Sequence, residues 1–239
     1  MCLGIFLCRF KSMNMNEEHK PFEFIIKRGL WDSRPRKLIM SDDCITFDDK
    51  SGEGDTLACF KKEEIKDCRY GVVWLRGLKF TIGREYQIYI RNIEDQVIKI
   101  NFSTFYGIKK NEYHDKCLEI INALWDLYFS DIAKKIITDF YEGKTVHVCD
   151  VDISETGVTI QSKGLFKTVK TEIAWKKLQT RAYVTYFAIY SSENPADINK
   201  SYKYMDDWNA IVLNGVLRTI VRENNKEIDS NKQPSMPSA

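Results

Sequence analysis

The order of patterned segments constrains the fold of this chain more than any other feature. Short segments rich in β-branched and aromatic residues come first, separated by clusters of Ser, Asp, Asn and Gly that favour turns. The expected strands of the first half are Phe22–Lys27, Arg36–Met40, Cys44–Phe47, Thr56–Phe60, Ile65–Trp74, Tyr86–Arg91 and Gln96–Phe102. These segments predict an antiparallel meander.

The apolar period then changes from two to nearly four, which predicts a helix beginning near Asn111. Its apolar face contains Tyr113, Cys117, Ile121, Leu124, Trp125 and Tyr128. A second amphipathic stretch follows, with Ser130 as its expected N-cap and Gly143 as its C-terminal stop. We expect the first helix to close one end of a sheet and the second to connect two structural units.

The strand pattern restarts after Gly143 and again leads into a helix. The expected strands are Thr145–Ile153, Val158–Gln161, Phe166–Trp175, Lys177–Val184, Tyr186–Ser191 and Ser201–Met205. The last helix is predicted from about Asp206 to Arg222, with Trp208 on its buried side. The second half therefore repeats the order of the first.

Two local matches support an internal duplication. The segment Leu38–Phe47 aligns with Val151–Ile160 as strand, three-residue polar turn and strand. Phe60-Lys61-Lys62 similarly aligns with Trp175-Lys176-Lys177. Overlooking an internal duplication can lead to the wrong fold being assigned. The alternative is one continuous α+β domain whose halves match by chance.

A strand meander closed by a C-terminal helix is the layout of the pleckstrin-homology (PH) superfold, and the sequence resembles bacterial PH-like proteins. The resemblance rests on Ile173–Leu178 as a mid-domain strand boundary, on the hairpin ending Glu155–Val158, and on Asn209–Leu213 as a closing helix. It implies an α+β, mostly β fold of two tandem PH-like barrels, each of antiparallel strands closed by a C-terminal helix.

The expected organisation has four parts. Residues 1–20 form a disordered N-terminus, 21–129 PH-like domain 1, 130–222 the connecting helix and PH-like domain 2, and 223–239 a disordered tail. Met13 or Met15 is an alternative start. The distance from Trp175 to Asn209 is shorter than the corresponding distance in the first half, which predicts a second module that is trimmed or lacks a strand.

Composition disfavours several classes of protein. The net charge is only +2, so no global field attracts a polyanion, and nucleic acid is an unlikely partner by this criterion. Strand aromatics are expected to fill the cores and not to form a base-stacking platform: Phe22, Phe24, Phe47, Tyr70, Tyr183, Tyr186 and Tyr190. Seven cysteines without zinc-ligand spacing indicate reduced thiols and a cytoplasmic protein.

The residues that carry catalytic chemistry form no recognisable pattern. The histidines are His19, His114 and His147, and no Cys/His or Ser/His/Asp arrangement follows from their spacing. No glycine-rich phosphate loop occurs. Aspartates cluster at hairpin ends, where turn propensity explains them more simply than a metal site does. We expect no catalytic residue, no metal and no cofactor.

One basic segment, from Lys27 to Lys37, separates the first two expected strands. It contains five cations and one anion, and its candidate ligand-binding residues are Lys27, Arg28, Trp31, Arg34, Arg36 and Lys37. The resemblance implies an anionic ligand here, because the corresponding loop of phosphoinositide-binding PH domains has a similar basic pattern. The alternative is a solvated or structural loop.

These observations favour a non-enzymatic interaction or scaffold protein whose two modules bind a protein or peptide. Strand addition to a sheet edge, or helix docking in a groove, is the expected mode. The alternative is peripheral binding to an anionic membrane surface, at the inner face of the membrane, through the 27–37 loop.

Overall fold

The computed structural model of the 239-residue chain describes residues 20–29, 32–48, 57–163 and 168–230. This part of the chain is mostly β, with several antiparallel sheets and flanking helices, as the sequence predicts. It divides into two compact units. The first unit comprises the described residues up to Asp131 together with the segment Tyr204–Asn209, and the second comprises Ile132–Lys203 and the chain from Ala210 onward.

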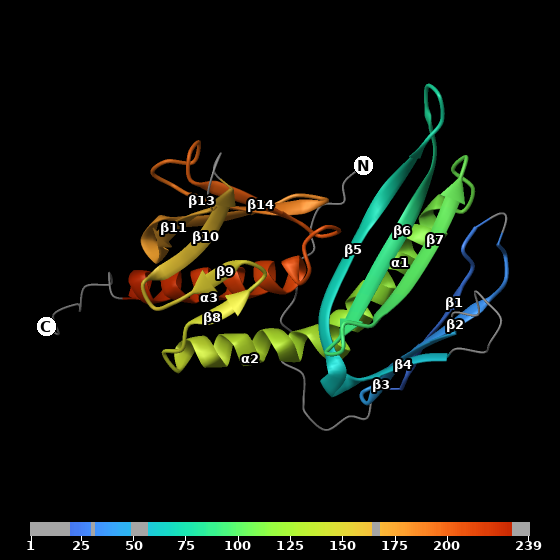
Figure 1. The fold of residues 1–239 in the computed structure, drawn as a ribbon, viewed down its shortest axis with the longest axis horizontal. Coiled ribbons are helices and arrows are strands. Elements are labelled where there is room, and N and C mark those ends of the chain that lie inside the picture. The colour runs from blue at the N-terminus through green and yellow to red at the C-terminus, as the bar shows by residue number, and fades with distance from the viewer. Residues whose placement is uncertain (1–19, 30–31, 49–56, 164–167, 231–239) are drawn as a thin grey trace, which may run out of the picture. The chain divides into compact units, whose positions relative to one another are not determined.

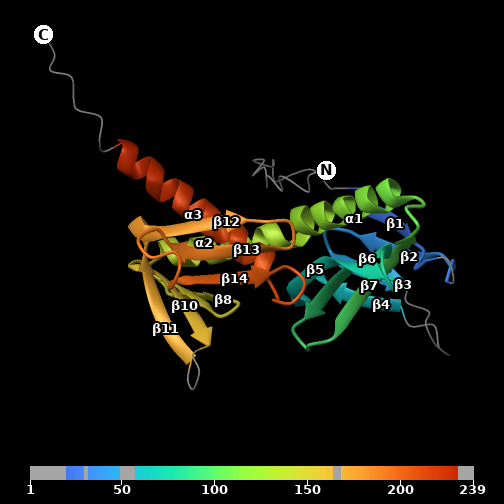
Figure 2. The same ribbon diagram turned by 90° about the horizontal axis from the view of Figure 1, so that it is seen from above.

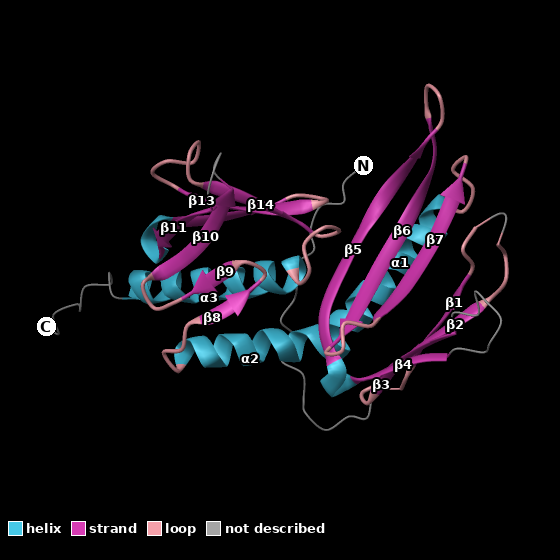
Figure 3. Cartoon of the chain, in the orientation of Figure 1, coloured by secondary structure: helices cyan, strands magenta, loops and turns pink. Residues whose placement is uncertain are grey.

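The first unit consists of two antiparallel sheets and a helix (Figures 1 and 3). One sheet has the order β1-β2-β3-β4 and the other β5-β6-β7, and a single 3-10 turn at Lys62–Glu64 connects them. The strands are β1 Phe22–Ile26, β2 Arg36–Met40, β3 Cys44–Asp48, β4 Leu57–Lys61, β5 Ile65–Arg76, β6 Thr81–Asn92 and β7 Val97–Phe105. Helix α1, Lys110–Leu124, follows β7.

The core of this unit follows the two periodicities expected from the sequence. Alternate residues of β6 and β7 are buried on one face, among them Tyr86, Ile88 and Phe102. Helix α1 buries the stripe that contains Cys117 and Ile121. Full burial of each large apolar side chain stabilises the fold by about 1.5–3 kcal/mol.

The helical stretch after α1 is continuous, so the prediction of Ser130 as an N-cap is wrong. A π-helical turn, Trp125–Phe129, leads directly into α2, Ser130–Tyr141. The Ser130 hydroxyl donates to the Asp126 carbonyl at 3.2 Å. Serine in a helix can satisfy its hydroxyl in this way, so it need not mark a helix start. The predicted stop at Gly143 is confirmed, since this residue has φ +79°.

The second unit repeats the element order of the first: four strands, a 3-10 turn, three strands and a helix (Figure 2). The 3-10 turn is Trp175–Lys177. The strands are β8 Val146–Val148, β9 Val151–Ile153, β10 Gly157–Lys163, β11 Thr168–Ala174, β12 Leu178–Ala182, β13 Tyr186–Ser191 and β14 Asn199–Lys203, and the helix is α3, Ala210–Ser230.

The second unit has the same number of strands as the first, so the predicted loss of a strand is wrong, whereas the predicted trimming is confirmed. The segment Thr145–Ile153 is not one strand, because Cys149 has φ +58° and reverses the chain so that Val148 pairs with Val151. The difference in size comes from strand length. Strands β5 and β6 have 12 residues each, whereas β12 has 5 and β13 has 6.

The aligned hairpins of the two units have the same turn geometry. The Ser41 amide donates to the Cys44 carbonyl at 3.0 Å, and the Ser154 amide donates to the Gly157 carbonyl at 2.9 Å. Each serine hydroxyl also donates to the same carbonyl as its amide, at 3.2 Å in both units. The predicted match of the two hairpins is confirmed at the level of individual hydrogen bonds.

A buried or half-buried aromatic side chain caps each of these turns. The Tyr128 hydroxyl lies 2.8 Å from the Ser41 carbonyl, to which it donates. The Trp175 indole N–H donates to the Ser154 carbonyl at 3.0 Å. Equivalent carbonyls thus accept hydrogen bonds from different elements. The donor comes from the π-helical turn Trp125–Phe129 in the first unit and from the 3-10 turn Trp175–Lys177 in the second.

The prediction of which strand aromatics are buried is only partly correct. Phe47 is fully buried, whereas Tyr183 is exposed. In β13 the buried side chains are Phe187 and Ile189, not the tyrosines on either side of them. Because side chains alternate in a strand, assigning the wrong parity moves the whole predicted set to the other face.

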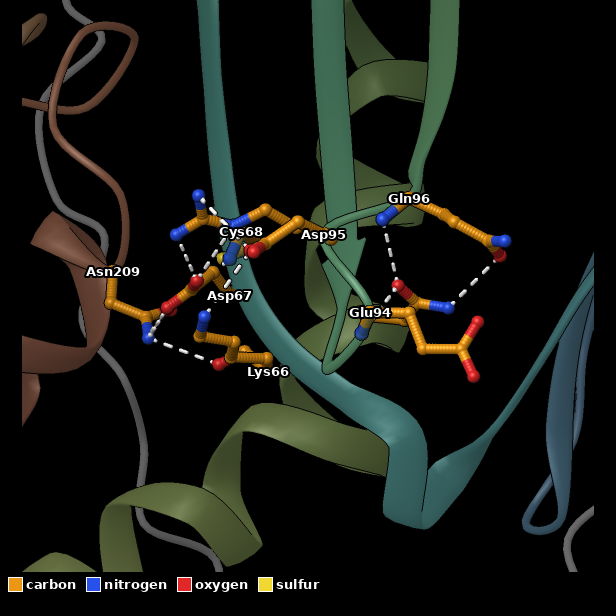
Figure 4. A network of polar contacts seen from close by, with 9 residues as sticks. Lys66, Asp67, Cys68, Glu94, Asp95, Gln96 and Asn209 are labelled. Carbon is orange, nitrogen blue, oxygen red and sulfur yellow. Dashed lines mark hydrogen bonds and ion pairs between the residues drawn. The ribbon is translucent and has the colours of Figure 1, made fainter.

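The segment Tyr204–Asn209 is a series of turns that contacts the edge of β5 inside the first unit, and Figure 4 shows Asn209 beside Asp67 and Cys68. The Tyr70 amide donates to the Tyr204 carbonyl at 2.8 Å, and the Asn209 amide donates to the Cys68 carbonyl at 2.8 Å. The Asn209 side chain accepts from the Cys68 amide at 3.1 Å and donates to an Asp67 carboxylate oxygen at 2.6 Å. One asparagine therefore continues the ladder with both its backbone and its side chain.

Trp208 belongs to the same segment, so its predicted place in the last helix is wrong. The Arg69 and Arg91 guanidinium groups each lie 4.4 Å from the centroid of its ring. Helix α3 begins only at Ala210, after Asn209 with φ +60°. It continues to Ser230, so residues 223–230 are helical and do not form part of a tail; residues 231–239, like 1–19, lie outside the described part.

Candidate functional site

Three connections of the first unit lie at the same end of its strands. The Ser103 amide of β7 donates to the Arg28 carbonyl, just beyond β1, at 2.8 Å. The Tyr106 amide, just beyond β7, donates to the Ile82 carbonyl of β6 at 2.7 Å. The β1–β2 loop, the β5–β6 hairpin and the β7–α1 corner are therefore neighbours. We call this region the cationic end; its basic residues are Lys27, Arg28, Arg34, Arg76, Lys79, Arg84, Lys109 and Lys110.

The structure divides the six candidate residues of the 27–37 loop into groups. Lys27 and Arg34 are exposed, and Arg28 is half-buried. The Arg28 backbone joins the loop to β7, which places this part of the loop beside the other two connections. Trp31 lies outside the described residues.

The remaining two candidates have partners within the fold. Arg36 is only 3% exposed, and its guanidinium donates to both carboxylate oxygens of Asp32, at 3.1 and 2.7 Å. This pairing lowers the pKa of Asp32. Lys37 forms a 2.9 Å ion pair with Glu23 on the neighbouring strand. Arg36 therefore stabilises the loop and leaves Lys27 and Arg34 as the candidates that face solvent.

The β5–β6 hairpin is a part of the site that the sequence reasoning missed. Trp74 pairs with Arg84 across the hairpin, with the guanidinium 4.1 Å from the ring centroid. The Gly77 amide donates to the Phe80 carbonyl at 2.8 Å and closes the tip. The segment from residue 72 to 84 contains three cations and no carboxylate, which is a signal visible in the sequence.

The β7–α1 corner adds exposed apolar and basic residues. Tyr106 and Ile108 are exposed, and Lys109, with φ +55°, precedes the first turn of α1. Lys109 forms a 3.2 Å ion pair with Glu112, and Lys110 is exposed.

The three connections at this end of the first unit are rich in cations. Residues 27–37, 72–84 and 106–111 together contain ten cations and one anion, in a chain whose net charge is only +2. Three of these cations, Arg36, Lys37 and Lys109, form ion pairs with Asp32, Glu23 and Glu112. The counterparts in the second unit differ. The β8–β9 turn is Cys149-Asp150, and the β12–β13 turn, residues 183–185, carries no charge. The cation-rich connections are thus a feature of the first unit.

The chemistry available here is recognition of anions beside an apolar surface. Exposed ammonium and guanidinium groups attract phosphate and carboxylate, and exposed aliphatic and aromatic side chains offer surface for burial.

The His147 ring is exposed, as expected for a solvent-facing strand position, and its Nδ1 lies 2.7 Å from an Asp152 oxygen.

Searches across the chain add three findings. Over residues 20–29, 32–48, 57–163 and 168–230, no group of three or more His, Cys, Asp or Glu side chains is arranged to hold a metal ion. No helix in the same part of the chain has the length and apolar character needed to cross a membrane. Comparison of the chain with protein-family models, curated proteins and solved structures gives no match.

Proposed function

We propose that this chain is a non-enzymatic binding protein of two PH-like modules, and that the first module docks on an anionic membrane surface through the cationic end. The observation that carries this proposal is the convergence of three basic connections at one end of the first unit. A cytoplasmic protein that meets the inner face of a membrane fits this distribution of charge.

The exposed cations should contribute a measurable free energy of binding to an anionic membrane. Each Lys or Arg near an anionic bilayer contributes about 1 kcal/mol, and the effect falls off within a Debye length of about 8–10 Å. Exposed cations such as Lys27, Arg34 and Lys79 satisfy this condition without rearrangement of the fold. Arg36 is excluded from the count because its guanidinium is buried against Asp32.

Strand addition of a peptide to the first unit has less support. An added strand needs a free sheet edge. At β5 the part of that edge at Cys68 and Tyr70 is occupied by the chain's own segment Tyr204–Asn209, which makes backbone hydrogen bonds to these two residues. Binding of a protein or peptide remains the alternative outcome of the test below, at surfaces other than this edge.

Vesicle sedimentation tests the proposal. The full chain is mixed with phosphatidylcholine vesicles, with and without phosphatidylserine, over a range of salt. We expect binding only to the anionic vesicles, weakening as salt rises. Replacing Lys27 and Arg34 by alanine removes about 2 kcal/mol, or roughly thirtyfold in affinity.

The matched control removes the same charge elsewhere in the first unit: Lys61→Ala with Lys99→Ala, both exposed and near the opposite end of its strands. This control should bind as the wild type does. Absence of binding to anionic vesicles, or equal weakening in both double variants, would refute docking through the cationic end.

A further inference from the structure

The β5–β6 hairpin of the first unit extends its strand pairing far beyond that of its counterpart. Cross-strand pairs continue through Trp74–Arg84 to Arg76–Thr81. The counterpart β12–β13 ends its pairing at Ala182–Phe187 and turns at once. Since the two units share their element order, the longer pairing is a difference between them, and the exposed residues at its tip do not belong to the buried core.

Apolar side chains on this hairpin face solvent as a group. Leu78 is fully exposed at the tip, Phe80 is 64% exposed and Trp74 is 49% exposed. Scattered single apolar residues on a surface need no explanation, but a contiguous exposed set marks an interaction surface. Within seven residues the hairpin offers one aliphatic and two aromatic side chains for burial.

The charges around these side chains indicate what they contact. Arg76, Lys79 and Arg84 flank them, and residues 72–84 include no carboxylate. Tryptophan beside a cation is favoured where a polar headgroup layer meets hydrocarbon, because its ring is amphipathic. An acidic lipid surface complements all three cations and also accepts the apolar groups between them.

We infer that the β5–β6 hairpin is a membrane-insertion element that places Leu78 and Phe80 at the boundary between the headgroups and acyl chains of an anionic bilayer. This inference rests on the proposed function and deepens it. Insertion is shallow, because the backbone groups at the tip need water or partners and cannot enter the hydrocarbon core. Two contributions then hold the chain on the membrane, electrostatic attraction and apolar insertion. Either contribution alone gives only marginal binding.

The test compares two double variants of the full chain on phosphatidylcholine–phosphatidylserine vesicles. L78S/F80S removes the inserted groups and no charge. Its matched control, I93S/V184S, removes two other exposed apolar side chains, Ile93 in the β6–β7 turn at the opposite end of the strands and Val184 in the β12–β13 turn. We expect L78S/F80S to lose at least about tenfold in affinity and the control to lose none.

A second readout follows Trp74 directly. Adding anionic vesicles should shift tryptophan emission of the wild type to the blue, and W74F should lose most of this shift while I93S/V184S keeps it. Circular dichroism of each variant confirms folding, which these exposed positions do not control.

The outcomes separate the two proposals. If the wild type binds no anionic vesicle, the proposed function fails. If the wild type binds and loss of Lys27 and Arg34 weakens it, but L78S/F80S binds equally well, insertion alone is refuted. If L78S/F80S instead converts a dimer to a monomer in sedimentation equilibrium, the hairpin is a self-association surface and the membrane assignment is overturned.

Discussion

Asn209 should be the most sensitive single position of the segment Tyr204–Asn209, and its replacement by alanine is predicted to release this segment from β5. The substitution removes the hydrogen bond that the Cys68 amide donates to the Asn209 side chain in a buried position, which costs about 1–3 kcal/mol. It also removes the 2.6 Å hydrogen bond to the Asp67 carboxylate, which contributes about 1.5–3 kcal/mol. Because such terms are not additive, we expect a total near 3 kcal/mol from the side chain.

Backbone conformation adds a separate term. Asn209 has φ +60°, a left-handed conformation that asparagine and glycine adopt more readily than alanine. Alanine should therefore lose about 1 kcal/mol more than glycine at this position. N209G is the matched control, since it loses the same hydrogen bonds without the backbone strain.

Native-state hydrogen exchange measures this release locally. The Tyr70 amide, bonded to the Tyr204 carbonyl, reports whether the segment stays in place. A loss of about 3 kcal/mol corresponds to roughly a hundredfold loss of protection. The Ser154 amide, in the second unit, is the internal reference and should be unaffected. Unchanged protection at Tyr70 in N209A would show that the side-chain network contributes little, and equal effects of N209A and N209G would refute the backbone argument.

Two further predictions concern titratable groups. Pairing with Arg36 lowers the pKa of Asp32 in the folded chain, so the stabilisation from this pair is present above the unfolded pKa and is lost as pH falls through the folded pKa. D32N should therefore be less stable than wild type in urea near neutral pH, and the difference should shrink in acid. A difference that stays constant with pH would contradict this pairing. Burial raises the pKa of the Cys117 thiol to about 12, so at neutral pH alkylation should modify exposed Cys59 well before Cys117, and equal rates in the folded chain would contradict the described burial.

Local pattern predicted much of the secondary structure because its causes are local. Strand β2, Arg36–Met40, and strand β13, Tyr186–Ser191, have the predicted bounds, and the turn at Ser41 is recognisable from polar residues between two apolar runs. The reversal at Cys149 was missed because a cysteine in the left-handed region lacks the Gly or Asn that usually marks such a turn. The strand around it consequently looked continuous.

The features that sequence missed depend on distant partners. Trp208 has helical spacing with the residues after it, yet its ring contacts two arginines of β5 and β6 that are more than a hundred residues away. At the candidate site, the sequence showed the positive charge of residues 27–37. It could not show that Arg36 is buried in an ion pair with Asp32, since burial depends on the tertiary structure. The exposure of Leu78 likewise follows from strand length beyond the core and not from its neighbours in sequence.

The paired turns provide a test of whether the two units share energetics as well as element order. Y128F removes the hydroxyl that donates to the Ser41 carbonyl, and W175F removes the indole N–H that donates to the Ser154 carbonyl. Each variant leaves an equivalent carbonyl without its side-chain donor, so each should destabilise its own unit by about 1 kcal/mol. Trp175 also loses ring area on change to phenylalanine, so W175F should cost somewhat more.

Hydrogen exchange of the turn amides resolves the two effects, because the donors lie in different units. Y128F should reduce protection at Cys44 and leave Gly157 unchanged, and W175F should do the reverse. If either variant lowers protection equally in both turns, the units do not open independently and the chain unfolds as one cooperative body. If neither variant changes protection at its own turn, the aromatic caps are packing groups only, and the shared turn geometry depends on its serine hydrogen bonds alone.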